Sequence, residues 1–124
     1  MKKGLLILAI AFTAISCGSD KTDTSKRFRT GTFEVPAGEN HDKFTFVRKD
    51  SLQIENYNGV IDTLVIHWED DFNYTAKYLH PKKSIEKETF HFRITGVKKD
   101  SYTYRFKIGN SNFNQEGTVM KIKN

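Results

Sequence analysis

The histidines of this sequence, together with one neighbouring acid, are the side chains that could bind a metal such as zinc. His67 and His91 both fall on the polar phase of alternating segments, so they could meet across a sheet with Glu69. Zinc sites use ligands at close and characteristic spacings, and these histidines show none of them. We therefore interpret the histidines as solvent-facing strand residues and predict no metal site and no cofactor. They are His41, His67, His80 and His91.

Acids and hydroxyls offer two other kinds of chemistry. Glu69, Asp70 and Asp71 form a run that could bind Ca²⁺ or act as a carboxylate pair. The run separates two alternating segments, and Asp is favoured in turns because it hydrogen-bonds locally, so we interpret it as structural. The serines considered as nucleophiles also lie in turns, and no nucleophile-elbow motif precedes a helix. The sequence thus predicts no catalytic residue and no enzyme; these serines are Ser51, Ser84, Ser101 and Ser111.

Cys17 is the residue for which the sequence predicts a covalent modification. It follows two lysines, Lys2 and Lys3, and an apolar run over residues 5–15, which is typical of a secretory signal and too short for a stable membrane span. Residues 14–16 (Ala-Ile-Ser) resemble the lipobox of bacterial lipoproteins. We therefore expect Cys17 to be lipidated with diacylglycerol and palmitate-type chains, and two or three acyl chains hold a protein on a membrane essentially permanently.

The charge of the chain argues against nucleic-acid binding. The chain carries 20 Lys and Arg against 15 Asp and Glu, and removal of residues 1–16 takes away two lysines and no acids, which leaves 18 against 15 and a net charge of +3. The basic residues are scattered among acids without a dense stripe. We therefore predict no nucleic-acid partner. The one cysteine would be consumed by lipid, so the domain must be held together by packing.

After a polar stretch up to residue 26, alternation of apolar and polar residues dominates the chain. Tyr102, Tyr104 and Phe106 alternate with polar residues, and turn signals recur every 8 to 12 residues, of which Asn58-Gly59 suits a type I′ hairpin. Residues 60–69 have apolar side chains on both phases and are predicted to be covered on both sides, with Trp68 in the core. The expected strands are 27–35, 42–49, 51–57, 60–69, 72–79, 88–96, 101–108 and 115–123.

These strands predict an all-β domain with a single antiparallel meander. Every connection is short, and no helix is long enough for a parallel crossover, although residues 81–86 could form one helical turn. A meander of about eight strands protects its edges best when it closes into an up-and-down, lipocalin-like barrel, which we favour. A β-sandwich of two sheets remains as the alternative.

Several short segments resemble one family. The chain is similar to small Bacteroidota lipoproteins of unknown function whose members are often labelled "DNA topoisomerase IV". The resemblance implies an envelope lipoprotein and assigns no activity or site residues. Many members carry a cysteine just before the Thr-Gly-Thr-Phe stretch (30–33 here) and another after the Trp-Asp segment, where this chain has Phe72, so the resemblance implies no disulfide here. The matching pieces are 28–33, 48–51, 59–63, 68–71, Tyr74, 80–82 and 117–118.

The topoisomerase label does not describe this chain. A type II topoisomerase needs a tyrosine nucleophile in a large DNA-gate domain, acids that hold Mg²⁺, and an ATPase with a glycine-rich phosphate loop. A lipid-anchored chain of 124 residues has no room for these parts. We therefore interpret the label as a misannotation.

Together these features predict a signal peptide (1–16), a lipidated cysteine with a flexible tether (17–26) and one β-domain (27–124). Gly18 rather than Asp follows Cys17, which favours the outer membrane, facing the periplasm. The first hypothesis is a domain that binds a small apolar or amphipathic ligand or an envelope protein. The alternative is a structural or accessory lipoprotein with a solid core and no ligand. Ten Phe and five Tyr favour a filled interior with at most a small cavity.

Overall fold

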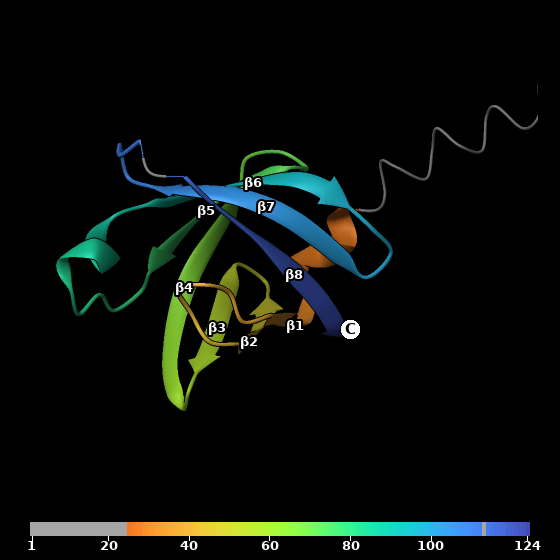
Figure 1. The fold of residues 1–124 in the computed structure, drawn as a ribbon, viewed down its shortest axis with the longest axis horizontal. Coiled ribbons are helices and arrows are strands. Elements are labelled where there is room, and N and C mark those ends of the chain that lie inside the picture. The colour runs from red at the N-terminus through yellow and green to blue at the C-terminus, as the bar shows by residue number, and fades with distance from the viewer. Residues whose placement is uncertain (1–24, 113) are drawn as a thin grey trace, which may run out of the picture.

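Eight antiparallel strands follow one another around a closed barrel (Figure 1). The computed structural model describes residues 25–112 and 114–124. Each strand pairs with the next along the chain, and the last pairs with the first, so the sheet has no free edge. The predicted up-and-down barrel is confirmed, and the sandwich alternative is wrong. The elements are η1 (Lys26–Arg29), β1 (Gly31–Val35), β2 (Phe44–Lys49), β3 (Leu52–Tyr57), β4 (Val60–Trp68), β5 (Asn73–Tyr78), η2 (Ser84–Lys87), β6 (Phe90–Val97), β7 (Ser101–Ile108) and β8 (Gln115–Lys123).

The first strand starts later than the sequence predicts, because residues 26–29 form the short 3-10 helix η1. Phe28 on this helix is fully buried, and its ring packs edge-on against Tyr102 at 5.1 Å. The helix thus closes one end of the barrel with an aromatic side chain. The local alternation could not distinguish this helix from a strand, because the position of Phe28 depends on its contact with Tyr102, which is distant in the sequence. Part of the predicted turn at 81–86 is helical, as η2.

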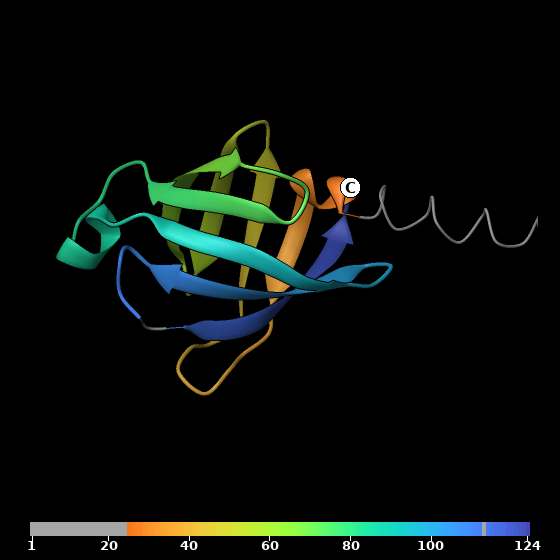
Figure 2. The same ribbon diagram turned by 90° about the horizontal axis from the view of Figure 1, so that it is seen from above.

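The two ends of the barrel differ in their connections. η1, the C-terminus and the short turns β2–β3, β4–β5 and β6–β7 lie at one end, which we call the closed end. The β1–β2 loop, the β3–β4 hairpin, η2 and the β7–β8 connection lie at the other, the open end. Figure 2 shows η1 and the C-terminus on one side and η2 on the other. In the hairpin, Asn58 (φ 52°) and Gly59 (φ 87°) both have positive φ, as a type I′ turn requires.

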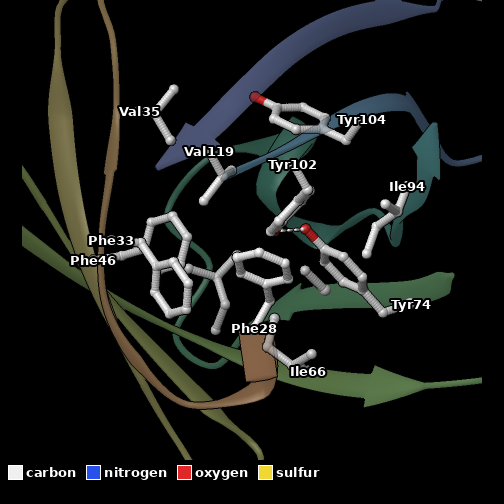
Figure 3. Packing of buried hydrophobic residues seen from close by; sticks show 12 residues of the cluster. Phe28, Phe33, Val35, Phe46, Ile66, Tyr74, Ile94, Tyr102, Tyr104 and Val119 are labelled. Atoms are coloured by element: carbon white, nitrogen blue, oxygen red, sulfur yellow. Dashed lines mark hydrogen bonds between the residues drawn. The ribbon is translucent and has the colours of Figure 1, made fainter. Parts of the chain in front are cut away.

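The buried core packs inside the barrel around Phe28 of η1, and part of it extends toward the open end, where Val35 ends β1 (Figure 3). Phe33 and Phe46 stack with ring centroids 5.0 Å apart, and the hydroxyls of Tyr74 and Tyr102 are 2.8 Å apart in a buried hydrogen bond. Large aromatic side chains contribute strongly to burial, and tyrosine is buried stably where its hydroxyl finds a partner. The inward phase that the sequence predicts for β7 is therefore confirmed.

One expectation for β4 is wrong, and another holds only in part. Ile61 and Val65 are 55% and 37% exposed, because a single barrel has one interior and nothing among the described residues covers the outside of this strand. Leu64 and Ile66 are buried as predicted. Trp68 faces the same way but is only half-buried, since it ends the strand at the closed rim, where its ring contacts Tyr74 at 4.6 Å.

Candidate ligand-binding cavity

A cavity of about 340 Å³ lies in the open half of the barrel. Several of its lining residues begin or end a strand at the open end, among them the first residue of β2 and the last of β3. Its volume is at the lower end of the range of about 300 to 1,000 Å³ that is usual for small-molecule pockets. The walls are mainly aromatic; these side chains include Phe44, Tyr57, Tyr78, Phe90, Tyr104 and Phe106.

The aromatic wall is continuous along β5, β6 and β7. Tyr78 and Phe90 have ring centroids 5.9 Å apart, Phe90 and Phe106 are 6.1 Å apart, and Phe92 and Phe106 are 5.1 Å apart. These residues share the inward phase of neighbouring strands, because Phe90 pairs with Ile108 and Phe92 with Phe106 in register. Rings packed side by side leave their remaining surfaces facing the cavity, which makes the wall apolar.

At the closed end of the cavity lies a buried arginine. Arg48 on β2 is 3% exposed and donates hydrogen bonds to the Phe28 carbonyl (2.9 Å), the Tyr74 hydroxyl (2.9 Å) and Gln53 Oε1 (2.9 Å). Its guanidinium carbon lies 4.8 to 5.8 Å from five ring centroids, an arrangement that stabilises a desolvated cation. The rings are those of Phe33, Phe46, Trp68, Tyr74 and Tyr102.

Gln53 connects this arginine to a carboxyl group. Arg48 and Gln53 are direct register partners on β2 and β3, and the next inward residue of β3 is Glu55. The Gln53 amide accepts from Arg48 with its oxygen and donates to Glu55 Oε2 at 2.8 Å with its nitrogen. Glutamine can do both at once, so the three side chains form a polar ladder along one wall of an otherwise apolar interior.

Glu55 is the acidic member of this polar ladder, and it lines the cavity. Burial raises the pKa of its carboxyl to about 7; the Gln53 hydrogen bond and the charge of Arg48 lower the pKa, whereas the nearby Asp62 raises it. Gln53 is the one hydrogen-bond donor that the described part of the chain offers to this carboxyl. Burial is the main cause that raises the pKa of the Tyr104 hydroxyl to about 12. A carboxyl group with spare acceptor capacity therefore lies in an aromatic cavity.

The histidines do not come together as a metal site. His67 on β4 and His91 on β6 lie in one row on the outside of the barrel, but Thr75 on β5 lies between them in register. Residues 25–112 and 114–124 contain no group of three His, Cys, Asp or Glu side chains placed to hold a metal ion. His41 lies in the β1–β2 loop at the cavity, and His80 lies in the β5–β6 connection.

The acidic run forms the β4–β5 turn, in keeping with its interpretation. Asp70 accepts hydrogen bonds from the Phe72 backbone N–H (2.8 Å) and from the Asn73 side chain (2.9 Å), and these bonds, the first above all, lower its pKa. Asp71 forms an ion pair with Arg29 at 3.3 Å.

The remaining predicted residues also fall outside the cavity or outside the description. Ser51 lies in a turn, Ser84 begins η2, Ser101 begins β7 and Ser111 lies in the β7–β8 connection. Cys17, for which lipidation is predicted, lies outside the described residues, as do the predicted signal peptide (1–16) and most of the predicted tether (17–26).

The polar ladder is what sequence reasoning missed. In the predicted strand 42–49, Arg48 continues the phase of Phe44 and Phe46, and this is the signal that could have placed it inside. In the next strand, Leu52 and Ile54 are apolar yet face outward, at 39% and 42% exposed, while the polar phase faces inward. A rule that points apolar residues inward therefore assigns the two faces of this strand incorrectly. Its inward polar residues find their hydrogen-bond partners on another strand, which the local pattern does not report.

The comparisons add no assignment to this geometry. No protein-family model, no curated protein and no solved structure matches the chain. None of the helices in the described residues has the length and apolar character to cross a membrane.

Proposed function

We propose that this protein is a lipid-anchored protein of the bacterial cell envelope whose barrel binds one small apolar or amphipathic molecule. The observation that carries the proposal is the cavity of about 340 Å³ in the open half, with its aromatic walls. A solid interior would favour the alternative, a structural lipoprotein without a ligand. Here the closed half is filled by the core, but the open half is not, although the chain is rich in large side chains.

The direction of the cavity fits a protein held on a membrane by its N-terminus. The first described residue, Ser25, precedes η1 at the closed end, whereas the cavity lies toward the opposite end. A tether from a lipidated Cys17 would therefore reach the barrel at its closed end. The open end would then be free to face the aqueous periplasm, so a ligand could enter without passing the anchor.

The anchor is tested by metabolic labelling. Cells supplied with a labelled fatty acid should label the wild-type protein and not Cys17→Ala, and the variant should appear in the soluble fraction. An unlabelled, soluble wild type would contradict the envelope part of the proposal and leave the cavity to be tested separately.

The cavity is tested with a neutral fluorescent probe, N-phenyl-1-naphthylamine, whose emission rises in apolar surroundings. Residues 18–124 contain the whole closed barrel and serve as the protein. Ala76 on β5 lines the cavity and is 1% exposed, while the adjacent Lys77 is exposed on the outer face. We expect saturable binding that Ala76→Phe weakens by about tenfold or more, because the new ring occupies the cavity. Lys77→Phe, the matched control, should bind like the wild type.

An envelope protein is the second candidate partner, and it would use the outside of the barrel. Val47 pairs with Ile54 and Leu52 with Val65 in register, and all four side chains are 37 to 42% exposed. Adjacent apolar residues on a surface are typical of protein contacts. The double variant Val47→Lys and Ile54→Lys should abolish cross-linking to an envelope protein in cells if this face is used, while leaving probe binding unchanged.

A further inference from the structure

The open half of the interior contains one carboxyl group whose hydrogen bonding is incomplete. Glu55 receives a hydrogen bond on Oε2 from Gln53, and the described residues place no donor on Oε1. A carboxylate has two oxygens and about four acceptor sites, so most of its capacity is unused. A buried carboxyl group without a cation next to it is costly to ionise, and a bound cation would remove that cost.

No basic side chain among the described residues contacts Glu55 directly. Arg48 is committed to three hydrogen bonds and five aromatic rings, and it reaches Glu55 through Gln53. Asp62, the register partner of Glu55 on β4, is another acid, and its ion pair at 3.1 Å is with Lys82, whose side chain is 58% exposed. The other titratable groups close by are Tyr78, Tyr104 and His41. The carboxyl group therefore lacks a direct basic partner.

The aromatic walls favour the same sign of ligand charge. The face of an aromatic ring carries the negative part of its quadrupole and attracts cations. Rings on β2, β3 and β5–β7 surround the space beside Glu55. A ligand carboxylate beside Glu55 would meet these faces and a second carboxyl group, whereas an ammonium group there would meet the ring faces and the carboxyl group; the cation Arg48 lies at the closed end of the cavity and is separated from Glu55 by Gln53.

We infer that the cavity selects amphipathic molecules whose polar end is a protonated amine, with the ammonium group bound by Glu55 and the apolar part held by the aromatic rings. This inference rests on the proposed ligand-binding function and names the ligand class. Glu55 is the residue that determines specificity, and the aromatic wall supplies affinity for the rest of the molecule.

Three eight-carbon probes with different polar ends test the inference: octylamine, 1-octanol and octanoate. Their affinities for residues 18–124 are measured by displacement of N-phenyl-1-naphthylamine at pH 7. We expect octylamine to bind about tenfold more tightly than 1-octanol, a difference typical of one charge-assisted hydrogen bond, and octanoate to bind least. Glu55→Gln should remove the preference for the amine and leave 1-octanol unchanged. Glu116→Gln, an exposed acid on the outside of β8, is the control.

The outcomes separate this inference from the proposed function. If N-phenyl-1-naphthylamine does not bind and none of the three compounds binds, the ligand-binding function itself fails. If 1-octanol binds as tightly as octylamine, or octanoate binds best, the amine assignment is overturned while the cavity function stands.

A second measurement on the wild type does not depend on the folding of the variant. Binding of a cation should ionise the protonated fraction of Glu55, so octylamine should release part of a proton per complex near pH 7. Calorimetry in two buffers of different ionisation enthalpy measures this number. No release on amine binding would overturn the inference.

Discussion

The two halves of the barrel interior treat a buried ionisable group in opposite ways. In the closed half, Arg48 has three hydrogen bonds and lies against five aromatic rings, although one side of it borders the closed end of the cavity. In the open half, Glu55 has one hydrogen bond and borders a cavity. The two groups are linked by a single amide, Gln53, yet one is satisfied by the protein and the other is left available.

This difference indicates which group serves the fold and which serves binding. Removal of one partner from a buried, satisfied charge network is strongly destabilising, because the remaining polar groups lose their partners. A buried charge with unused acceptors instead lowers stability until something binds it. We therefore expect the closed half to contribute more to the stability of the barrel, and on the proposed function the open half is less stable because Glu55 is left available for a ligand.

The largest effect is expected at the arginine. Arg48→Met keeps an apolar stem but leaves Tyr74, Gln53 and the Phe28 carbonyl without their donor, so it should lower the free energy of unfolding by about 3 to 5 kcal/mol. Arg105→Met, in which an exposed ion pair with Glu116 is lost, should change it by less than about 0.5 kcal/mol. Urea denaturation of both variants measures this contrast. Equal, small losses would mean that Arg48 is not a structural centre.

Glu55 should make stability depend on pH, in a direction set by its pKa. The folded-state pKa of about 7 lies above the ordinary value of 4.5, so the folded state holds the proton more tightly than the unfolded state. The contribution of Glu55 to stability is therefore highest below about pH 4.5, falls as the pH rises through 7 and then levels off, with a total loss of roughly 3 kcal/mol from this group.

Glu55→Gln should remove this loss, because the amide does not ionise but can still accept from Gln53. Denaturation at pH 5 and pH 8 should show the variant gaining on the wild type at the higher pH. A constant difference between the two proteins at both pH values would contradict the buried, uncompensated carboxyl group.

A smaller effect is expected where a glycine supports the cavity wall. A Cβ atom at Gly117 would lie 2.4 Å from the Tyr104 hydroxyl and 2.6 Å from its ring, since the two residues are paired in register. Gly117→Ala should push the ring away from β8, cost about 1 to 3 kcal/mol and weaken probe binding. The neighbouring Thr118→Ala, on the outer face, should do neither. Unchanged probe binding in Gly117→Ala would show that Tyr104 does not shape the cavity.

Much of the fold follows from sequence because alternation and turn residues are local signals. Seven of the eight expected strands, and the Asn58-Gly59 hairpin, needed no knowledge of distant contacts. The start of the first strand did, since Phe28 leaves the alternating pattern only to plug the barrel. Whether Ile61 and Val65 would be covered also depended on the overall fold. The barrel has a single interior, so these two side chains are exposed on its outer face.

The candidate site was less accessible to sequence reasoning for a related reason. Gln53 and Glu55 are polar residues on a strand whose other phase is apolar, so their pattern alone points them outward. They face inward because β3 pairs with β2 and β4 in a register fixed by the hairpins. The cavity itself depends on which aromatic rings leave space unfilled, and no spacing rule reports that.

The most direct test of the contrast between the two halves is an NMR titration of residues 18–124 with octylamine, followed through assigned amide and side-chain signals. We predict saturable, one-to-one shifts concentrated at the inward residues of the open half, such as Glu55, Phe90 and Phe106. The Arg48 Nε–H group should keep its hydrogen bond to Gln53, so its NMR signal should shift little. Shifts that do not saturate, or that gather at Val47 and Ile54 on the outer face, would contradict the account.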